Sequence, residues 1–225
     1  MPATANEFQL SADRTIWTIG FDFEDQARLE GFKLIAGLDE VGRGCIAGPV
    51  VAAACILNAE KEMPDGLDDS KKLTPEKREE ITEQLKAECV AYAIGQVEAD
   101  EIDRINILEA TKKAMLIAIA ALKPAADYLL IDALYLKQCR LPQKSIIKGD
   151  SISASIAAAS ILAKTYRDDL MKSYDATYPE YGFAAHKGYG AATHYDAIRL
   201  HGACDIHRKS FKGVCEDVVL PTGLF

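Results

Sequence analysis

Two adjacent acids, Asp39 and Glu40, stand just before a glycine-flanked arginine, Gly42-Arg43-Gly44. A short apolar run, 34–36, precedes them and a longer one, 47–57, follows, and both are typical of strands. The acids therefore fall where a strand ends. An ionised carboxylate is costly to bury without a partner, and a metal ion is one such partner. The glycines let the backbone approach a ligand closely, and the arginine can reach a phosphate.

Two other interpretations of this stretch stay open. One is a solvated turn that happens to contain acids and glycines. The other is a dinucleotide-dependent oxidoreductase, because Gly42-x-Gly44-x-x-Ala47 fits the G-x-G-x-x-A fingerprint. That fingerprint requires a helix to follow, whereas Pro49, Val50 and the residues after them predict a strand.

Two further acids lie at the ends of predicted elements. Asp132 ends the apolar run 128–131. Asp150 follows the apolar pair 146–147 and precedes an alanine-rich helix predicted over 152–173, whose N-terminus favours an ionised acid. The sequence therefore delivers acids from three separate segments to element ends.

Together Asp39, Glu40, Asp132 and Asp150 offer four carboxylates with no His or Cys ligand nearby, a set that suits Mg²⁺ or Mn²⁺. Such a cluster repels itself without a cation. Two ions about 3.5–4 Å apart can activate a water and stabilise the leaving oxygen of a phosphodiester. Neighbouring strand residues point to opposite faces, so Asp39 and Glu40 both reach the metals only if the strand breaks there or if Glu40 uses its main-chain carbonyl. Asp39 is the better candidate for a ligand shared by both ions.

The rest of the chain predicts the elements that position these acids. Thr74 and Pro75 are a strong helix start, and Pro124 stops a later helix. Strands with helices between and after them predict an α/β fold, a mixed sheet flanked by helices, with a C-terminal helical segment. We expect strands over 33–39, 47–57, 90–97 and 128–132, and helices over 24–31, 74–88, 103–123 and 152–173, with 1–13 a loose tail.

Size and composition bound the class of protein. A chain of 225 residues, 49% hydrophobic and 27% charged, suits one α/β domain with a core of its own. It has no run of about eighteen apolar residues and no features of a signal peptide, so we expect a cytoplasmic protein. The six cysteines are expected to be free thiols. A zinc site made by His201, Cys204, His207 and Cys215 is the alternative, although zinc ligands are usually spaced more tightly.

The charge is distributed unevenly along the chain. The net charge of −8 argues against a nucleic-acid partner, but residues 137–225 carry a balance of +3, against −11 for 1–136. A locally basic face can bind phosphates despite an acidic total.

An ordered series of motifs runs through most of the chain. It comprises Asp-Glu-Val-Gly-Arg-Gly (39–44), Asp-Ser-Lys-Lys-Leu (69–73), Leu-Ile-Asp (130–132), Lys-Gly-Asp (148–150), Ala-Ala-Ala-Ser-Ile-Leu-Ala-Lys (157–164), Arg-Asp (167–168), Tyr-Pro-x-Tyr-Gly-Phe (178–183), His-Lys-Gly-Tyr-Gly (186–190) and His-Arg-x-Ser-Phe (207–211). No single motif is decisive, but the set is highly specific, and it resembles the bacterial ribonuclease HII family over about residues 33–212. Two departures, Cys45 where many members have Pro and Ala133 where Gly often follows the acid, touch no acid.

The resemblance implies a ribonuclease H-like fold and an endoribonuclease that cuts the RNA strand of RNA–DNA hybrids. It also implies cutting on the 5′ side of a single ribonucleotide in duplex DNA, leaving 3′-hydroxyl and 5′-phosphate ends, with two Mn²⁺ or Mg²⁺ ions. The expected division is a tail with a short helix (1–32), the catalytic domain with its C-terminal helical segment (33–212) and a C-terminal tail (213–225). A monomer is expected, and no sliding-clamp partner can be assigned.

The resemblance also implies roles for particular residues. Asp39, Glu40, Asp132 and Asp150 match the metal-binding acids. The backbone of Gly42, Arg43 and Gly44 matches the loop that reads the 2′-hydroxyl, and Tyr189 matches a tyrosine that senses the RNA–DNA junction. The positions matched near phosphates are Ser70, Lys71, Lys72, Ser160, Lys164 and Lys187.

Several of these residues have plainer interpretations. Tyr189 could serve packing, and Lys71 and Lys72 could be solvated loop charges. His186 and His207 are interpreted as structural, because two-metal hydrolysis needs no histidine base. A non-catalytic nucleic-acid-binding module of the same fold is the remaining rival function.

Overall fold

The computed structural model describes residues 19–215, and it is built on one five-stranded mixed sheet. The strands lie in the order β3-β2-β1-β4-β5. β1 pairs antiparallel with β2 and parallel with β4, so the two acid-bearing strands are neighbours that run in the same direction. The strand bounds are β1 Ile35–Val41, β2 Val50–Ile56, β3 Ala91–Val97, β4 Tyr128–Asp132 and β5 Gln143–Ile146.

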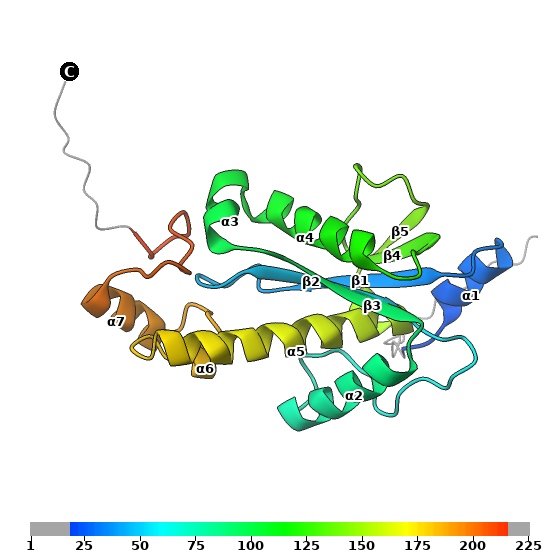
Figure 1. Ribbon diagram of the computed structural model, residues 1–225, viewed down its shortest axis with the longest axis horizontal. Coiled ribbons are helices and arrows are strands. Elements are labelled where there is room, and N and C mark those ends of the chain that lie inside the picture. Colours follow the sequence, from blue (N-terminus) through cyan, green and yellow to red (C-terminus); the bar gives the residue numbers. More distant parts are fainter. Residues whose placement is uncertain (1–18, 216–225) are drawn as a thin grey trace, which may run out of the picture.

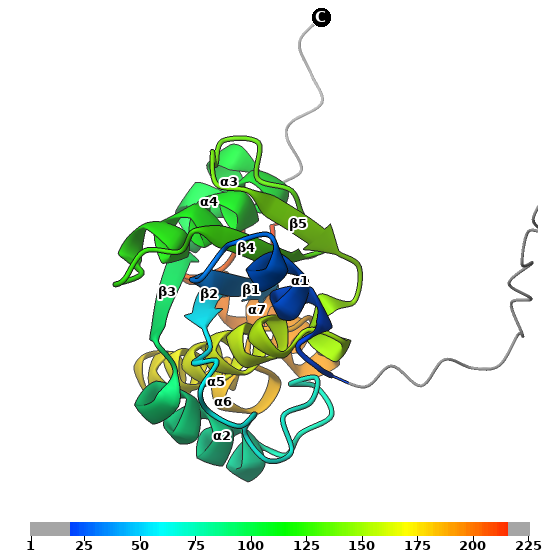
Figure 2. The same cartoon turned by 90° about the vertical axis from the view of Figure 1, so that its right-hand side faces the viewer.

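Helices cover both faces of the sheet (Figure 1). α4 packs on one face across β2 and β3, and the long α5 packs on the other across β1 and β2, with α2 outside α5 (Figure 2). The helix bounds are α1 Asp22–Leu29, α2 Pro75–Glu88, α3 Ala99–Ile105, α4 Ile107–Ala121, α5 Ala154–Thr177, α6 Phe183–His186 and α7 Ala192–His201, with the 3₁₀ turn η1 Gly149–Ser151 before α5. The predicted mixed sheet flanked by helices, with a C-terminal helical segment, is confirmed.

Small residues let the helices lie close to the sheet. Every residue of β2 is buried, and its side chains alternate between the two faces. A Cβ on Gly37 would lie 2.0 Å from the Ser155 carbonyl carbon on α5, and one on Gly95 would lie 2.1 Å from the Ala114 oxygen on α4. Both glycines are therefore required for helix–sheet packing at its closest points.

Several predicted boundaries differ from the observed ones by one to four residues. The helix predicted over 103–123 is two helices, because Asn106 has a φ of 68° and caps α4 by accepting hydrogen bonds from the N–H groups of Leu108 and Glu109. β1 continues through Val41 rather than stopping at Asp39. α5 runs on to Thr177 rather than 173. The predicted tail 1–13 lies outside the described residues.

The N-terminal helix α1 and the C-terminal helices pack against the same body. Glu24 of α1 is buried and accepts hydrogen bonds from the hydroxyls of Ser153 and Ser155 at the start of α5. α6 and α7 pack on the far end of α5 through Phe183 and Ile198. Within residues 19–215, no helix is long and apolar enough to cross a membrane.

Candidate active site

The sheet brings Asp39 and Asp132 to the same level. In the parallel pair β1–β4, Leu38 lies opposite Ile131, so the acid that follows each of them stands at the same edge of the sheet. Asp150 reaches this edge from η1, which follows β5. Asp39 and Asp150 are both buried. The sequence prediction that three separate segments converge therefore agrees with the topology.

A cavity of about 360 Å³ opens beside these acids. Seven of the residues singled out from the sequence line it, together with two that were not, Val41 and Arg78. The predicted members are Asp39, Glu40, Ser70, Lys71, Ser160, Lys164 and Tyr189. They come from β1, the loop before α2, α5 and the segment after α6, so residues far apart in sequence share one hollow.

The strand does not break between the two adjacent acids. β1 runs through Val41, and Asp39 and Glu40 pair in register with Ala53 and Ala52 of β2. Both acids nevertheless line the cavity. The strand break, one of the two conditions under which both acids would reach the metals, is therefore absent. The other condition, use of the main-chain carbonyl of Glu40, remains a prediction.

The carboxylates are held in a setting that disfavours their charge. Burial raises the pKa of Asp39 well above its usual range, and the charge of Glu40 raises it further. Burial also raises the pKa of Glu40, against the opposing effect of Arg43, and it raises the pKa of Asp132 as well. Cations are needed to stabilise the ionised forms together.

Two basic side chains of the protein already neutralise part of this charge. Lys71 Nζ lies 3.3 Å from Asp150 Oδ2, and Arg43 Nη1 lies 3.0 Å from Glu40 Oε1. Backbone N–H groups donate hydrogen bonds to the other two acids. Glu40 N donates to Asp39 Oδ1 at 2.8 Å, and Gly149 N donates to Asp132 Oδ1 at 2.7 Å. The acids are thus held in place by the fold itself.

The donor chemistry fits a hard divalent cation. Asp39 and Glu40 line the cavity, and Asp150 is joined to its lining by Lys71. Glu40 Oε2 is buried and has no hydrogen-bond partner in the described part of the chain, so it is an acceptor that a cation would satisfy. In the arrangement seen for residues 19–215, however, no three His, Cys, Asp or Glu side chains are gathered closely enough to hold an ion on their own. Instead, Arg43 forms an ion pair with Glu40, and Lys71 forms one with Asp150.

One wall of the cavity is fixed by a buried charge network. Asp168 of α5 accepts from Lys164 Nζ at 2.7 Å and from Arg78 Nη2 at 3.3 Å. Arg78 Nη1 also donates to the carbonyls of Ser70 and Leu73, at 3.1 and 2.7 Å. This network ties the lysine-bearing loop to α2 and α5, and it positions Lys164 at the cavity.

Arg78 and Asp168 were not predicted as site residues. Arg78 stands in the first turn of α2, where the helix dipole disfavours a positive charge. A cation at that position needs an anionic or carbonyl partner, and that signal could have marked it from the sequence. The hydroxyls of Ser70 and Ser160, which were predicted, meet at 2.9 Å beneath the same wall.

The glycine-flanked loop has one tight glycine and one open glycine. Gly42 has a φ of +90°, and a Cβ there would lie 2.3 Å from Arg167 Nε. Gly44 has nothing within 4 Å of a Cβ position. The loop therefore needs Gly42 for packing, while the space at Gly44 is open on the exposed side, where Arg43 also lies.

Two fully buried arginines bind the carbonyls of this loop and of the segments beside it. Arg167 donates to the carbonyls of Pro49, Ala47 and Lys187 at 2.8–3.0 Å. Arg208 donates to the carbonyls of Gly48 and Arg43, both at 3.0 Å. Neither guanidinium has a carboxylate partner among the described residues, so both direct their charge at main-chain dipoles.

The remaining predicted residues lie at the rim of the cavity or outside it. Tyr189 has 44% of its surface exposed and stands at the rim. Lys187 lines a neighbouring hollow with Asp168, and Lys72 is exposed and pairs with Asp68. Neither lysine is brought against the acids.

The alternatives raised by the sequence do not fit this geometry. β2 follows the glycine loop where a dinucleotide fingerprint requires a helix. His207 contacts Cys204, but no metal-binding group of three is present among residues 19–215. The histidines pack in a cluster with Phe183 and away from the acids, which is the structural role expected for His186 and His207.

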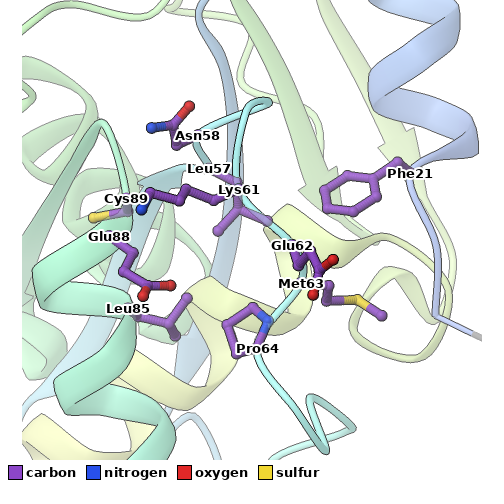
Figure 3. A pocket seen from close by; sticks show the side chains of 10 residues that line it. All are labelled: Phe21, Leu57, Asn58, Lys61, Glu62, Met63, Pro64, Leu85, Glu88 and Cys89. Atoms are coloured by element: carbon purple, nitrogen blue, oxygen red, sulfur yellow. The ribbon is translucent and has the colours of Figure 1, made fainter.

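A further hollow lies beyond the other end of β2, away from the acids (Figure 3). It is lined by Phe21, Leu57, Met63, Leu85 and neighbouring residues, and its volume is about 10 Å³. That volume is near the minimum for a single water and is too small for a nucleotide.

The chain was compared with known protein families and structures. The model of the family described as Ribonuclease HII matches residues 36–214. A "Ribonuclease HII" from Chlamydia abortus is 58% identical over 193 residues, covering 85% of this chain and 90% of its own. The crystal structure of ribonuclease H2 from Pyrococcus horikoshii OT3 shares the fold with a TM-score of 0.69, at 24% identity over 82% of this chain and 96% of that one. The structure of Bst-RNase HIII in complex with Mn²⁺ has a TM-score of 0.64, at 21% identity over 84% and 70% of the two chains.

Proposed function

The chain belongs to the ribonuclease HII family, metal-dependent endonucleases that cut the RNA strand of RNA–DNA hybrids, and on that premise we propose how its own residues perform the reaction. We propose that Asp39, Glu40, Asp132 and Asp150 are the catalytic acids. We further propose that the enzyme acts as a monomer and also cuts 5′ of a single ribonucleotide embedded in duplex DNA, leaving 3′-hydroxyl and 5′-phosphate ends.

The four acids would hold two divalent cations, Mg²⁺ or Mn²⁺. When bound, such ions supply an activated water and stabilise the leaving oxygen. Asp39 is the candidate for the shared ligand, because it is buried and its pKa is raised by burial and by the charge of Glu40. Glu40 Oε2, buried and unpartnered, adds a second acceptor beside it. A related protein, Bst-RNase HIII, has been crystallised with Mn²⁺, which supports this ligand class.

The basic residues around the cavity would bind the phosphates. Lys164 is fixed by Asp168, and Lys71, three-quarters of whose side chain is exposed, can leave Asp150 to meet a phosphate. The Ser70 and Ser160 hydroxyls support the lysine loop and the Asp39 carboxyl. Lys72 and Lys187, farther out, would contact the duplex backbone.

The 2′-hydroxyl would be read by backbone groups of Gly42, Arg43 and Gly44. The open space at Gly44 lets a sugar approach the main chain, and the buried arginines keep the loop from moving away. Tyr189 would present its ring to the sugar at the junction. The observation that carries the proposal is that Asp39, Glu40 and Tyr189 line one cavity, so chemistry and sugar recognition share a single site.

One cleavage assay tests the proposal. The same end-labelled duplex is prepared as DNA, as an RNA–DNA hybrid and with one ribonucleotide, and each is incubated with Mg²⁺, Mn²⁺ or EDTA. We expect cutting of the last two substrates only, metal-dependent and abolished by Asp39→Asn with the circular dichroism spectrum unchanged. Metal-dependent cutting at the wild-type rate by Asp39→Asn would remove Asp39 from the site. Binding without any cutting would support the non-catalytic module instead.

A further inference from the structure

Three histidines gather behind Tyr189 on the side away from the acids. His186 and His194 stack with ring centroids 4.2 Å apart, and His194 meets His207 through the two Nε2 atoms. His194 and His207 are fully buried, beside Phe183. None of the three lines the acid-bearing cavity, so the two-metal reaction leaves them without a role.

The hydrogen bonds assign a tautomer to each of the two buried rings. The backbone N–H of Cys204 donates to His207 Nδ1 at 2.9 Å, so this nitrogen carries no proton. The proton of His207 is then on Nε2, which lies 3.0 Å from His194 Nε2 and donates to it. His194 in turn carries its proton on Nδ1, which donates to the Tyr189 carbonyl at 2.8 Å. The backbone N–H of Cys204 therefore fixes the tautomers of both rings, so that His194 Nδ1–H donates to the Tyr189 carbonyl.

His186 holds the adjoining residues in the same way. Its Nδ1 accepts from the Gly188 N–H at 3.2 Å, and its Nε2 therefore donates to the Tyr181 carbonyl at 2.8 Å. The carbonyl of Gly188 accepts from the N–H groups of Ile46 and Ala47, which follow the glycine loop. The tyrosine segment and the glycine loop are thus joined at Gly188.

The surroundings keep both buried rings neutral. Burial lowers the pKa of His194 and of His207 to about 4. A protonated ring would place a donor against a donor at the contact between the two Nε2 atoms. The hydrogen bonds that run from Cys204 N–H through His207 and His194 to the Tyr189 carbonyl are therefore intact at neutral pH without any charged partner.

We propose that His207 and His194 are positioning residues that set the orientation of Tyr189 through a relay of fixed tautomers, Cys204 N–H to His207 to His194 to the Tyr189 carbonyl. The relay lets the enzyme hold Tyr189 against a substrate sugar using only neutral groups. The inference rests on the proposed role of Tyr189 in reading the ribonucleotide. The Tyr189 carbonyl also accepts from the Ala191 N–H, so loss of the relay changes the orientation of the segment rather than releasing it.

The first test reads the tautomers directly in the wild-type protein. Nitrogen-15 NMR of the imidazole rings at neutral pH should show the Nε2–H form for His207 and the Nδ1–H form for His194. A scalar coupling across the Nε2–H···Nε2 hydrogen bond should also be detectable. The opposite tautomer on either ring would overturn the relay, whatever any variant does.

The second test uses amides that mimic one ring nitrogen each. In Asn, the amide nitrogen stands where Nδ1 stands in His; in Gln, it stands where Nε2 stands. His194→Asn should therefore keep the donor to Tyr189, whereas His194→Gln should lose it. We expect the ratio of single-ribonucleotide to hybrid cutting to fall about tenfold in His194→Gln, the size of one lost hydrogen bond, and to recover in His194→Asn. Likewise His207→Gln should be milder than His207→Asn.

Tyr189→Ala separates the failure of this inference from failure of the proposed function. If Tyr189→Ala loses single-ribonucleotide cutting while His194→Gln and His194→Asn keep the wild-type ratio, the relay does not position Tyr189 and the inference is wrong. If Tyr189→Ala itself keeps the wild-type ratio, the proposed role of Tyr189 is wrong. The positioning role of His194 and His207 is then wrong as well. If the variants fold poorly, the NMR result on the wild-type protein decides.

Discussion

Alanine at Gly42 and alanine at Gly44 should have opposite consequences, although the two glycines flank the same arginine. Gly42 has a φ of +90°, and a Cβ there would lie 2.3 Å from Arg167 Nε, whereas a Cβ on Gly44 meets nothing within 4 Å. We expect Gly42→Ala to destabilise the fold. Gly44→Ala should leave the fold intact and act only where a substrate comes close to the loop.

The structure gives the size of the Gly42 effect. A side chain in the left-handed region costs about 1–2 kcal/mol. The Arg167 guanidinium must also move, and each hydrogen bond that a charged group gives up costs about 1.5–3 kcal/mol. If one of the three hydrogen bonds from Arg167 to carbonyls breaks, the free energy of unfolding should fall by about 2.5–5 kcal/mol, a large part of the roughly 5–15 kcal/mol available to a domain.

Urea unfolding and the cleavage assay together measure this contrast. Gly44→Ala should unfold within about 1 kcal/mol of wild type, as an ordinary surface substitution does, yet cut the single-ribonucleotide duplex more slowly. Gly42→Ala should lose stability first, and its activity should follow its folded fraction. Equal destabilisation by the two changes would refute the assignment of Gly42 to packing. Unchanged cutting by Gly44→Ala would refute the close approach of substrate at that position.

Three further outcomes follow from the charges. The pKa of His194 and of His207 lies near 4 in the folded protein and near 6.5 in the unfolded chain, so the unfolded chain takes up protons first as pH falls. The free energy of unfolding should therefore drop by about 2 kcal/mol per ring between pH 7.5 and 5. In urea titrations, His194→Asn and His207→Gln should each lack the part of this pH dependence that the replaced ring contributes. Asp39→Asn removes a buried like charge, so it should raise the melting temperature of the metal-free protein by a few degrees. The variant should also lose part of the further rise in melting temperature that Mn²⁺ gives to wild type. A lower metal-free melting temperature would contradict the repulsion between Asp39 and the neighbouring acids. Lys71→Ala should reduce the salt dependence of duplex binding by about one counterion, measured by fluorescence anisotropy, whereas Lys123→Ala, just after α4 on the other face of the sheet, should not.

Local patterns placed Asp39 and Asp132 on strands, because each of these two acids directly follows an apolar run. The runs before Asp39 and Asp132 have strand length and composition, and both are strands. The pairing of those strands as parallel neighbours in register, Leu38 opposite Ile131, joins segments that are far apart in the chain. No periodicity in either segment encodes that partner. The resemblance implied the fold class but did not specify this strand pair.

The features that could not be predicted from the sequence are tertiary. The apolar spacing predicts one continuous helix, but the helix breaks at Asn106. The Asn106 side chain caps the N-terminus of α4, so a new helix begins there. Arg78 and Asp168 meet at 3.3 Å from two helices whose packing angle the sequence does not contain. Arg167 and Arg208 look like surface charges in the sequence, yet both are fully buried, and their hydrogen bonds to other described residues all go to main-chain carbonyls.

Those two arginines also bear on the acidic total of the chain. A net charge of −8 opposes a polyanionic duplex, and the acids of the cavity add to that opposition locally. Burial lowers the pKa of Arg208 to about 10, so it stays charged at neutral pH although its Nη2 has no hydrogen-bond partner within residues 19–215. A buried guanidinium is screened by salt much less than an exposed lysine is. Arg167 and Arg208 therefore keep a positive field beneath the loop that carries Arg43, which in the proposed function is where the phosphate backbone approaches the acids.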